Sequence, residues 1–187
     1  MATNKCNTIK GFTLDLCQPN LGGIKNIWLA DWEENVATLD STEDATVAEK
    51  LIDGKITALK EGIVWTHYPM RKNTCSMTST LNNSAEGASY VTTELAMVFS
   101  KMETQKRIAI QALAIGQVMA VVEDSNGERW FLGKDEPLIA TAGTGETGTA
   151  KADSNRYSLT LTDESLGFPY PLATTIQLTV KKEEEEE

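Results

Sequence analysis

The stretch that decides the fold is KNTCSMTSTLNNSAEGASYVTTELAMVF, residues 72–99. On both sides of the turn-rich segment NSAEG, more apolar residues alternate with more polar ones. This two-residue period is typical of a half-buried β-strand. The second run places five residues on the face expected to meet the core: Val91, Thr93, Leu95, Met97 and Phe99. The opposite face carries Tyr90, Thr92, Glu94, Ala96 and Val98. The stretch therefore predicts two long antiparallel strands joined as a hairpin.

This predicted hairpin is too long and too polar for the interior of a small domain. Each run has about 12 residues, whereas strands usually have roughly 5–6. Both runs are rich in Thr and Ser, and each has one strongly apolar face. The hairpin must therefore face water or pair with a neighbouring chain. The residues expected to meet a neighbouring subunit are Thr74, Ser76, Thr78, Thr80 and Glu86.

A helix is predicted directly after the hairpin, over Lys101–Ile115. Ser100 and Glu103 have the spacing of a capping box, and Gly116 fits the position that ends a helix. Apolar residues repeat at helical spacing and are expected to pack as one stripe on the subunit's own sheet. The stripe consists of Ile108, Ala112 and Ile115.

The other strands are predicted from alternating or apolar runs bounded by turns. Pro69 restricts GIVWTHYPM to the edge or the end of a sheet, and the Asn126-Gly127 pair predicts a tight hairpin between QVMAVVED and ERWFLG. The remaining predicted strands are Ile24–Trp32, Arg156–Thr162 and Thr174–Val180. Together the elements predict a mainly β fold, an antiparallel β-sandwich or barrel with one flanking α-helix.

A chain of 187 residues suggests a single domain, which we place at residues 1–182. Residues 31–61 contain nine acidic residues and three lysines, and we expect this segment to be a solvated excursion rather than core. Residues 183–187 are a block of glutamates and are expected to form a frayed acidic tail.

The segment AGTGETGTAK, Ala142–Lys151, has the glycine spacing of a phosphate-binding loop but lacks the rest of the motif. Two residues separate Gly148 from Lys151, so the lysine is not placed to reach a phosphate. The sequence after the loop alternates as a strand does, whereas a phosphate-binding loop opens a helix. We therefore expect a flexible loop between two strands.

Charge and rare residues exclude several classes of site. The net charge of −10 argues against binding nucleic acid through its phosphates. Cys6, Cys17 and Cys75 lack zinc-ligand spacing, His67 is the single histidine, and three free thiols in a reducing compartment are expected. We predict no catalytic residue, no cofactor and no metal site. Apolar runs are too short for a membrane span of about 20 residues, and the N-terminal sequence argues against a secretory signal.

The order of features resembles a known family. The segments that carry the likeness are GGIKNIWLADW, HYPMRKNTCSMTSTLNNSAEGASYVTTELAMVFSKM, ETQKRIAIQALAIGQ, MAVVEDSNGERWFLG and GTGETGTAKADSNRYSLTLT, within roughly Gly22 to Pro171. In this succession the chain resembles phage and prophage virion proteins of the tail-tube type. Each motif is common alone, and their shared order makes the resemblance.

The resemblance implies a function as well as a fold. Tail-tube subunits are β-sandwiches with a flanking helix whose long strands join neighbours in a ring, here a hexamer, around a channel that DNA traverses without specific binding. It implies a non-enzymatic protein of the virion, assembled in the host bacterial cytoplasm, with other tail or neck proteins as partners. Tyr90, Thr92 and Glu94 would then face the lumen. The C-terminal glutamates have no counterpart in the family.

Two alternatives stay open from the sequence. The first is a neck, connector or tail-terminator ring at the head–tail junction, because the same subunit fold recurs there. The second is a carbohydrate- or receptor-binding β-sandwich, in which tryptophans supply stacking faces. Its candidates are Trp28, Trp32, Trp65 and Trp130.

Overall fold

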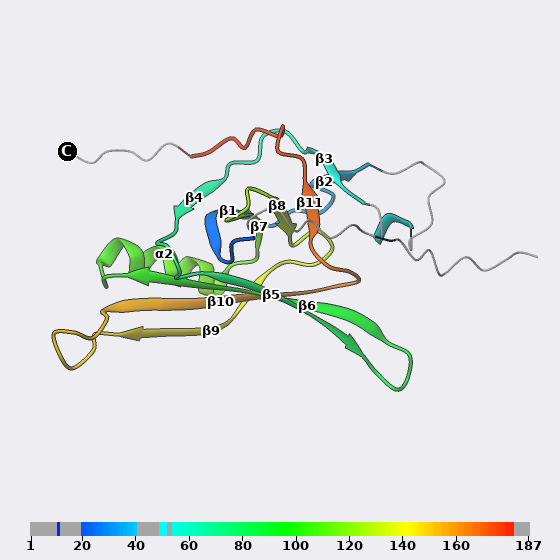
Figure 1. Ribbon diagram of the computed structural model, residues 1–187. Coiled ribbons are helices and arrows are strands. Elements are labelled where there is room, and N and C mark those ends of the chain that lie inside the picture. Colours follow the sequence, from blue (N-terminus) through cyan, green and yellow to red (C-terminus); the bar gives the residue numbers. More distant parts are fainter. Residues whose placement is uncertain (1–10, 12–19, 41–48, 52–53, 182–187) are drawn as a thin grey trace, which may run out of the picture.

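The computed structural model describes residue 11 and residues 20–40, 49–51 and 54–181. These residues form two packed β-sheets and a flanking helix, α2 (Thr104–Ile115), as Figure 1 shows. The larger sheet has the strand order β2 (Ala37–Leu39), β3 (Ile56–Leu59), β11 (Tyr170–Leu172), β8 (Arg129–Leu132), β7 (Val118–Asp124), β1 (Ile24–Asp31) and β4 (Thr66–Pro69). The smaller sheet has the order β5 (Ser76–Asn83), β6 (Ser89–Ser100), β10 (Arg156–Ser165) and β9 (Ile139–Glu146). The predicted β-sandwich with one flanking helix is confirmed.

The main core lies between the two sheets. Its centre is formed by side chains of β1 and β7 from the larger sheet and of β6 and β10 from the smaller one, all buried. They include Ile27, Leu29, Ala120, Val122, Leu95, Met97, Leu159 and Leu161. Leucine and methionine side chains enter this core from β6 and β10 while the residues between them point outward, so each of these strands buries one face only.

A second core covers the other face of the seven-stranded sheet. Trp65 and Phe131 meet edge to face there, with ring centroids 6.3 Å apart, and Ile56 is fully buried beside them. Ile176 and Leu178 pack over this cluster from the C-terminal segment. Because the larger sheet is covered on both faces, β7 begins with five consecutive buried residues, the run VMAVV.

The long hairpin is built as its alternation predicts. β5 has 8 residues and β6 has 12, and they pair antiparallel from Ser76↔Ala96 to Asn83↔Ser89. On β6 the residues of one parity are buried, namely Val91, Thr93, Leu95 and Met97. The tip of the hairpin extends beyond the sandwich in Figure 1. The short hairpin β7–β8 and the position of Pro69 on edge strand β4 are also confirmed.

The segment 31–61 is not the solvated excursion that its charge predicts. β2 and β3 pair within it, Val36 and Ile56 are buried, and residues 49–51 are helical. The acidic residues flank apolar ones that pack in the second core, so the segment extends the larger sheet. Residues 41–48 and 52–53 lie outside the described part of the chain.

Two predictions in the C-terminal half are wrong: the strand at Thr174–Val180, and the flexible loop over the whole of Ala142–Lys151. The strand lies at Tyr170–Leu172, and Thr174–Val180 forms only an isolated bridge between Val180 and Trp65. The alternation of Ile176 and Leu178 reflects packing on the second core rather than pairing with a strand. The glycine-rich segment is strand β9 as far as Glu146, and a turn then leads into β10, so the rejection of a phosphate-binding loop is confirmed.

Helix α2 differs from its prediction at both the start and the buried face. It starts at Thr104, and Glu103 precedes it without a side-chain capping bond, because the Glu103 carboxylate binds Lys101 at 2.5 Å and Lys106 at 3.0 Å. Leu113 is the buried residue of the helix, and Ala109 and Ile110 flank it with partly buried side chains. The predicted stripe points away from the sheets instead: Ile108 is 59% exposed, Ile115 is 80% exposed, and Ala112 is exposed with them.

A comparison of Ile108→Asp with Leu113→Asp tests this orientation. We expect Ile108→Asp to change the free energy of unfolding by no more than about 0.5 kcal/mol, because the side chain is in water. Leu113→Asp should lower it by roughly 3 kcal/mol or more, because it buries an unpaired charge. Urea denaturation of the monomeric protein measures both. Equal losses would contradict the assignment of the two faces.

Asp163 on β10 is a buried carboxyl that connects the two sheets. Its Oδ2 accepts a hydrogen bond of 3.0 Å from the backbone N–H of Gly133, and Oδ1 has no partner. Burial raises the pKa of Asp163 to about 6, although the Gly133 N–H and the Thr93 hydroxyl favour its ionised form; Asp135 and Glu136 add a smaller repulsion. The folded state therefore favours the protonated carboxyl.

This raised pKa predicts how stability depends on pH. The stabilising effect of proton binding is complete below the unfolded pKa of about 4 and is lost as the pH rises through the folded pKa of about 6. Relative to the parent, Asp163→Asn should gain at most about 3 kcal/mol of unfolding free energy between about pH 4 and pH 7.5. Urea denaturation across this range measures the difference. Glu164→Gln, on the exposed face of the same strand, is the control and should show no such gain.

Candidate functional site

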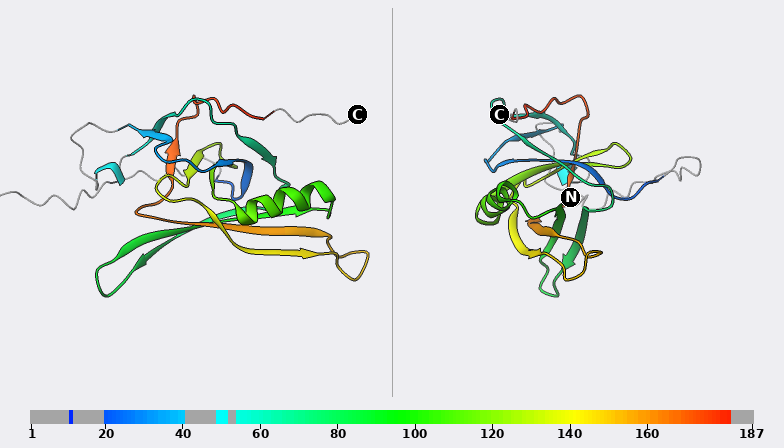
Figure 2. Two further views of the ribbon diagram at one scale, coloured as in Figure 1. Left: turned by 180° about the vertical axis from the view of Figure 1, so that it is seen from behind. Right: turned by 90° about the vertical axis from the view of Figure 1, so that its left-hand side faces the viewer.

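The outer face of the four-stranded sheet is the most distinctive surface of the described chain. It is formed by the residues of β5, β6, β9 and β10 whose parity turns them away from the main core, and we call it the polar face. Its members include Ser76, Thr78, Thr80, Asn82, Tyr90, Thr92, Glu94, Ser158, Thr160, Thr162 and Glu164. No other element of the described residues covers this face in the views of Figures 1 and 2. An apolar inner face and a polar outer face are typical of antiparallel sheets that pack on a core on one side and meet solvent on the other.

Hydroxyl and amide groups on the polar face bind one another across the strands. Thr144 and Ser158 lie 2.6 Å apart, Thr141 and Thr162 lie 2.8 Å apart, and the Asn82 side chain donates to Thr92 at 2.8 Å. Such cross-strand pairs hold the side chains in place. The surface is therefore ordered, polar and largely uncharged.

The charges on the polar face are few and mainly negative. Glu94 and Glu164 carry exposed carboxylates there, and the guanidinium of Arg156 is bound to Glu146 at one end of β10. A surface that binds DNA needs unpaired cations to replace the counterions of the phosphates. This face instead repels phosphates weakly.

The same sheet has two open edges. Among the described residues, β5 pairs only with β6 and β9 pairs only with β10. Each of these edge strands has 8 residues. An edge strand presents a row of unpaired backbone N–H and C=O groups that can bind the strand of another chain.

The residues predicted to face the lumen and those predicted to meet a neighbouring subunit lie largely on the same surface, the polar face. Tyr90, Thr92 and Glu94 lie on the polar face, as their parity predicts, and the predicted hairpin contacts Ser76, Thr78 and Thr80 face the same way, because Thr78 is opposite Glu94 and Thr80 is opposite Thr92. The other two predicted hairpin residues lie elsewhere. Thr74 precedes β5 and its hydroxyl donates to the carbonyl of Arg71, and Glu86 lies in the turn at the hairpin tip.

Sequence reasoning missed the half of the polar face that β9 and β10 supply. Thr160 and Thr162 on β10 pair with β6, and Thr144 belongs to β9, which was predicted as a loop. The alternation in RYSLTLT contained the signal for β10, because its polar residues share one parity. β9 has the sequence IATAGTGE, and its glycine-rich second half carries no pattern that marks it as a strand.

The tryptophans and the histidine are in structural positions. Trp65 is buried in the second core, and the indole N–H of Trp32 donates to the carbonyl of Gly133 at 2.9 Å. Trp28 stacks on His67 with ring centroids 5.3 Å apart, and the Arg129 guanidinium lies over its ring. These rings are engaged within the subunit, so the geometry gives no support to a sugar-stacking platform.

Other kinds of site are not found within the described residues. This part of the chain has no cluster of three or more metal-binding side chains, and none of its helices is long and apolar enough to cross a membrane. Cys75 is a free, buried thiol, whereas Cys6 and Cys17 lie outside the described residues. Neither the protein-family models nor the curated proteins include a match to this chain. Function is therefore inferred from the geometry of the four-stranded sheet.

Proposed function

We propose that this chain is a structural subunit of the tail-tube type, which closes into a ring around a channel for DNA. The observation that carries the proposal is the four-stranded sheet with a polar, uncovered outer face and two open edges of equal length. The resemblance of the sequence to tail-tube proteins agrees with it and implies a hexamer in the virion. No enzymatic activity is part of this proposal.

Ring closure follows from the two edges. The strand order β5-β6-β10-β9 is antiparallel throughout, so β5 of a second copy can continue the alternation beside β9 of the first. Repetition of this step joins the sheets of all copies, and the last β9 then meets the first β5. A closed barrel has no unpaired strand, so closure removes the aggregation hazard that both edges present.

The polar face would then line the channel. In a barrel all residues of one parity point inward, and the opposite parity of this sheet is occupied by the main core. Hydroxyls and a few carboxylates give DNA no cations to bind, and the net charge of −10 has the same effect at longer range. The subunit thus needs to present to the passing DNA only a polar surface without cations that would bind its phosphates.

Assembly of the purified protein is the direct test. At high micromolar concentration we expect sedimentation velocity to detect a closed oligomer and negative-stain microscopy to show rings with a central opening. Rings that stack into tubes would favour a tube subunit, whereas rings that stay single would favour a neck, connector or terminator ring. A protein that remains monomeric at every salt concentration would contradict the proposal.

Charge reversal on the polar face tests the channel separately from assembly. Glu94→Lys with Glu164→Lys should leave the free energy of unfolding within about 0.5 kcal/mol of the parent, because both carboxylates are exposed and exposed charges contribute little. Assembled particles should gain an affinity for DNA that falls with salt, since added lysines release counterions from phosphates. Retention of DNA by the particles at low and moderate salt measures this effect.

The matched control places the same two charges elsewhere. Glu34→Lys with Glu61→Lys changes exposed residues on the side of the larger sheet. If the control pair retains as much DNA as the polar-face pair, or if neither pair retains any, then the polar face does not line the channel.

A further inference from the structure

Helix α2 presents an apolar stripe that none of the described residues of its own subunit covers. Ile108 and Ile115 are 59% and 80% exposed, and both lie on the side of the helix opposite the buried Leu113. The exposed side chain of Arg107 lies beside them and forms no ion pair with any described residue. A helix face with two isoleucines and a free cation is unusual for a surface that meets only water.

The stripe lies on one lateral side of the subunit. α2 packs along β9, which is one open edge of the four-stranded sheet. The right-hand view of Figure 2 looks along the long strands and shows α2 at the outer margin, next to β9. A neighbour that pairs with β9 therefore lies on the side that the stripe faces.

The turn between β7 and β8, residues 124–128, lies on the opposite side. β7 begins at Val118, close after the end of α2, and runs for 7 residues to Asp124. At about 3.4 Å per residue this strand carries the chain roughly 20 Å across the subunit. Figure 2 shows the turn projecting on the side away from α2.

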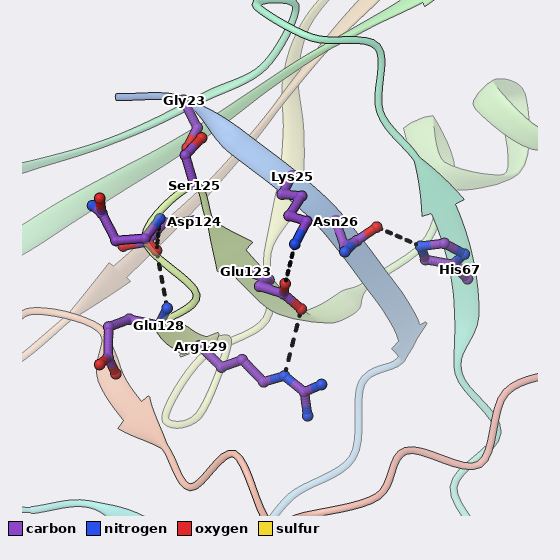
Figure 3. Close-up of polar contacts among 10 residues, drawn as sticks. Gly23, Lys25, Asn26, His67, Glu123, Asp124, Ser125, Glu128 and Arg129 are labelled. Atoms are coloured by element: carbon purple, nitrogen blue, oxygen red, sulfur yellow. Dashed lines mark hydrogen bonds and ion pairs between the residues drawn. The ribbon is translucent and has the colours of Figure 1, made fainter. Parts of the chain in front are cut away.

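The β7–β8 turn is a fixed acidic projection with one exposed apolar residue attached. Asp124 Oδ1 accepts backbone N–H bonds from Asn126 at 2.8 Å and from Glu128 at 3.0 Å, which closes the turn (Figure 3). The backbone N–H of Leu21 donates to the Asn126 side chain at 2.9 Å, and Leu21 is 58% exposed.

The carboxylates at this turn differ in how they are paired. Glu123 lies between Lys25 and Arg129, at 3.6 and 3.7 Å, as Figure 3 shows. Glu128 is exposed and forms no ion pair with the described residues. The turn thus carries a free carboxylate and an exposed leucine, and α2 carries a free guanidinium and exposed isoleucines.

We infer that α2 of one copy binds the β7–β8 turn of a second copy, with Leu21 against Ile108 and Ile115, and Glu128 paired with Arg107. The inference rests on the proposed ring and adds a second lateral contact to the pairing of β9 with β5. The two surfaces differ and lie on opposite sides of one subunit, so the contact is head to tail and can close a ring.

Charge favours a second copy over another partner. The segment 101–115 has three basic residues and one acidic residue, a balance of +2, in a chain whose net charge is −10. The segment 123–128 has three acidic residues and no basic one. Each copy therefore carries both halves of a complementary pair, and the attraction between them weakens as salt screens it.

A charge swap tests the contact directly. We expect Arg107→Glu and Glu128→Arg each to weaken assembly about tenfold, because each places like charges opposite one another. The double variant restores the pair in reverse and should assemble within about threefold of the parent. Sedimentation velocity over a concentration series measures all three. Lys151→Glu, in the turn between β9 and β10, is the matched control and should assemble like the parent.

The outcomes separate this contact from the ring itself. If the parent assembles and both single variants assemble equally well, the α2 contact is overturned while the ring proposal stands. If both single variants are weakened and the double variant does not recover, direct pairing of Arg107 with Glu128 is overturned. A parent that never assembles overturns the ring and this contact together.

Discussion

Burial of one face only along the long strands β6 and β10 is the constraint on which the rest of the structure depends. Leu95 and Met97 on β6 and Leu159 and Leu161 on β10 enter the main core. Their neighbours of opposite parity are Glu94, Ala96 and Val98 on β6 and the hydroxyl-bearing Ser158, Thr160 and Thr162 on β10. A one-residue slip would exchange the two sets, which would expose the leucines and bury hydroxyls without partners. The register between β6 and β10, ten pairs long, is therefore held by the core.

The larger sheet makes this one-sided burial possible. It is covered on both faces, by the smaller sheet and by the second core around Trp65, and it is therefore the central layer of the subunit. Asp163 connects the two layers through the backbone N–H of Gly133, and the carbonyl of Gly133 accepts a hydrogen bond from Trp32, which directly follows β1. The smaller sheet can then leave one face and two edges free without loss of order, and those free groups are the ones that an assembly would use.

The sequence predicted the parts of the fold that depend on local pattern. The alternation in residues 72–99 predicted the hairpin and its parity, and Asn126-Gly127 predicted the tight turn. It could not identify the buried face of α2, because Ala109 and Leu113 repeat at the same spacing as Ile108 and Ala112. When two apolar stripes lie on one helix, only the tertiary structure decides which of them is covered.

Long-range pairing explains the other differences. Residues 31–61 are acidic on average, yet Ile56 is fully buried because β3 pairs with β11, more than a hundred residues later in the chain. The alternating residues of Thr174–Val180 pack on the second core without a strand partner, whereas β11 contains a proline and still pairs with β8. For the candidate site, the alternation in the sequence of β5 and β6 predicted which of their residues belong to the polar face. The contribution of β9 was not predicted, since its glycines resemble a loop until β10 lies beside it.

The negative net charge of the chain makes the location of its basic residues significant. Subunits with a charge of −10 repel one another at low salt, so a lateral contact must offset that repulsion locally. Backbone pairing between two edges contributes hydrogen bonds but no electrostatic attraction between side chains, and the polar face adds further carboxylates to a closed ring. The basic side of α2 and the acidic β7–β8 turn are placed where opposite charges would meet between neighbours. In the proposed ring, a weakly acidic channel wall and a basic outer contact would be compatible in one subunit because the sandwich separates them. The wall would be the outer face of one sheet, and the contact would be formed by the helix and the turn beside it.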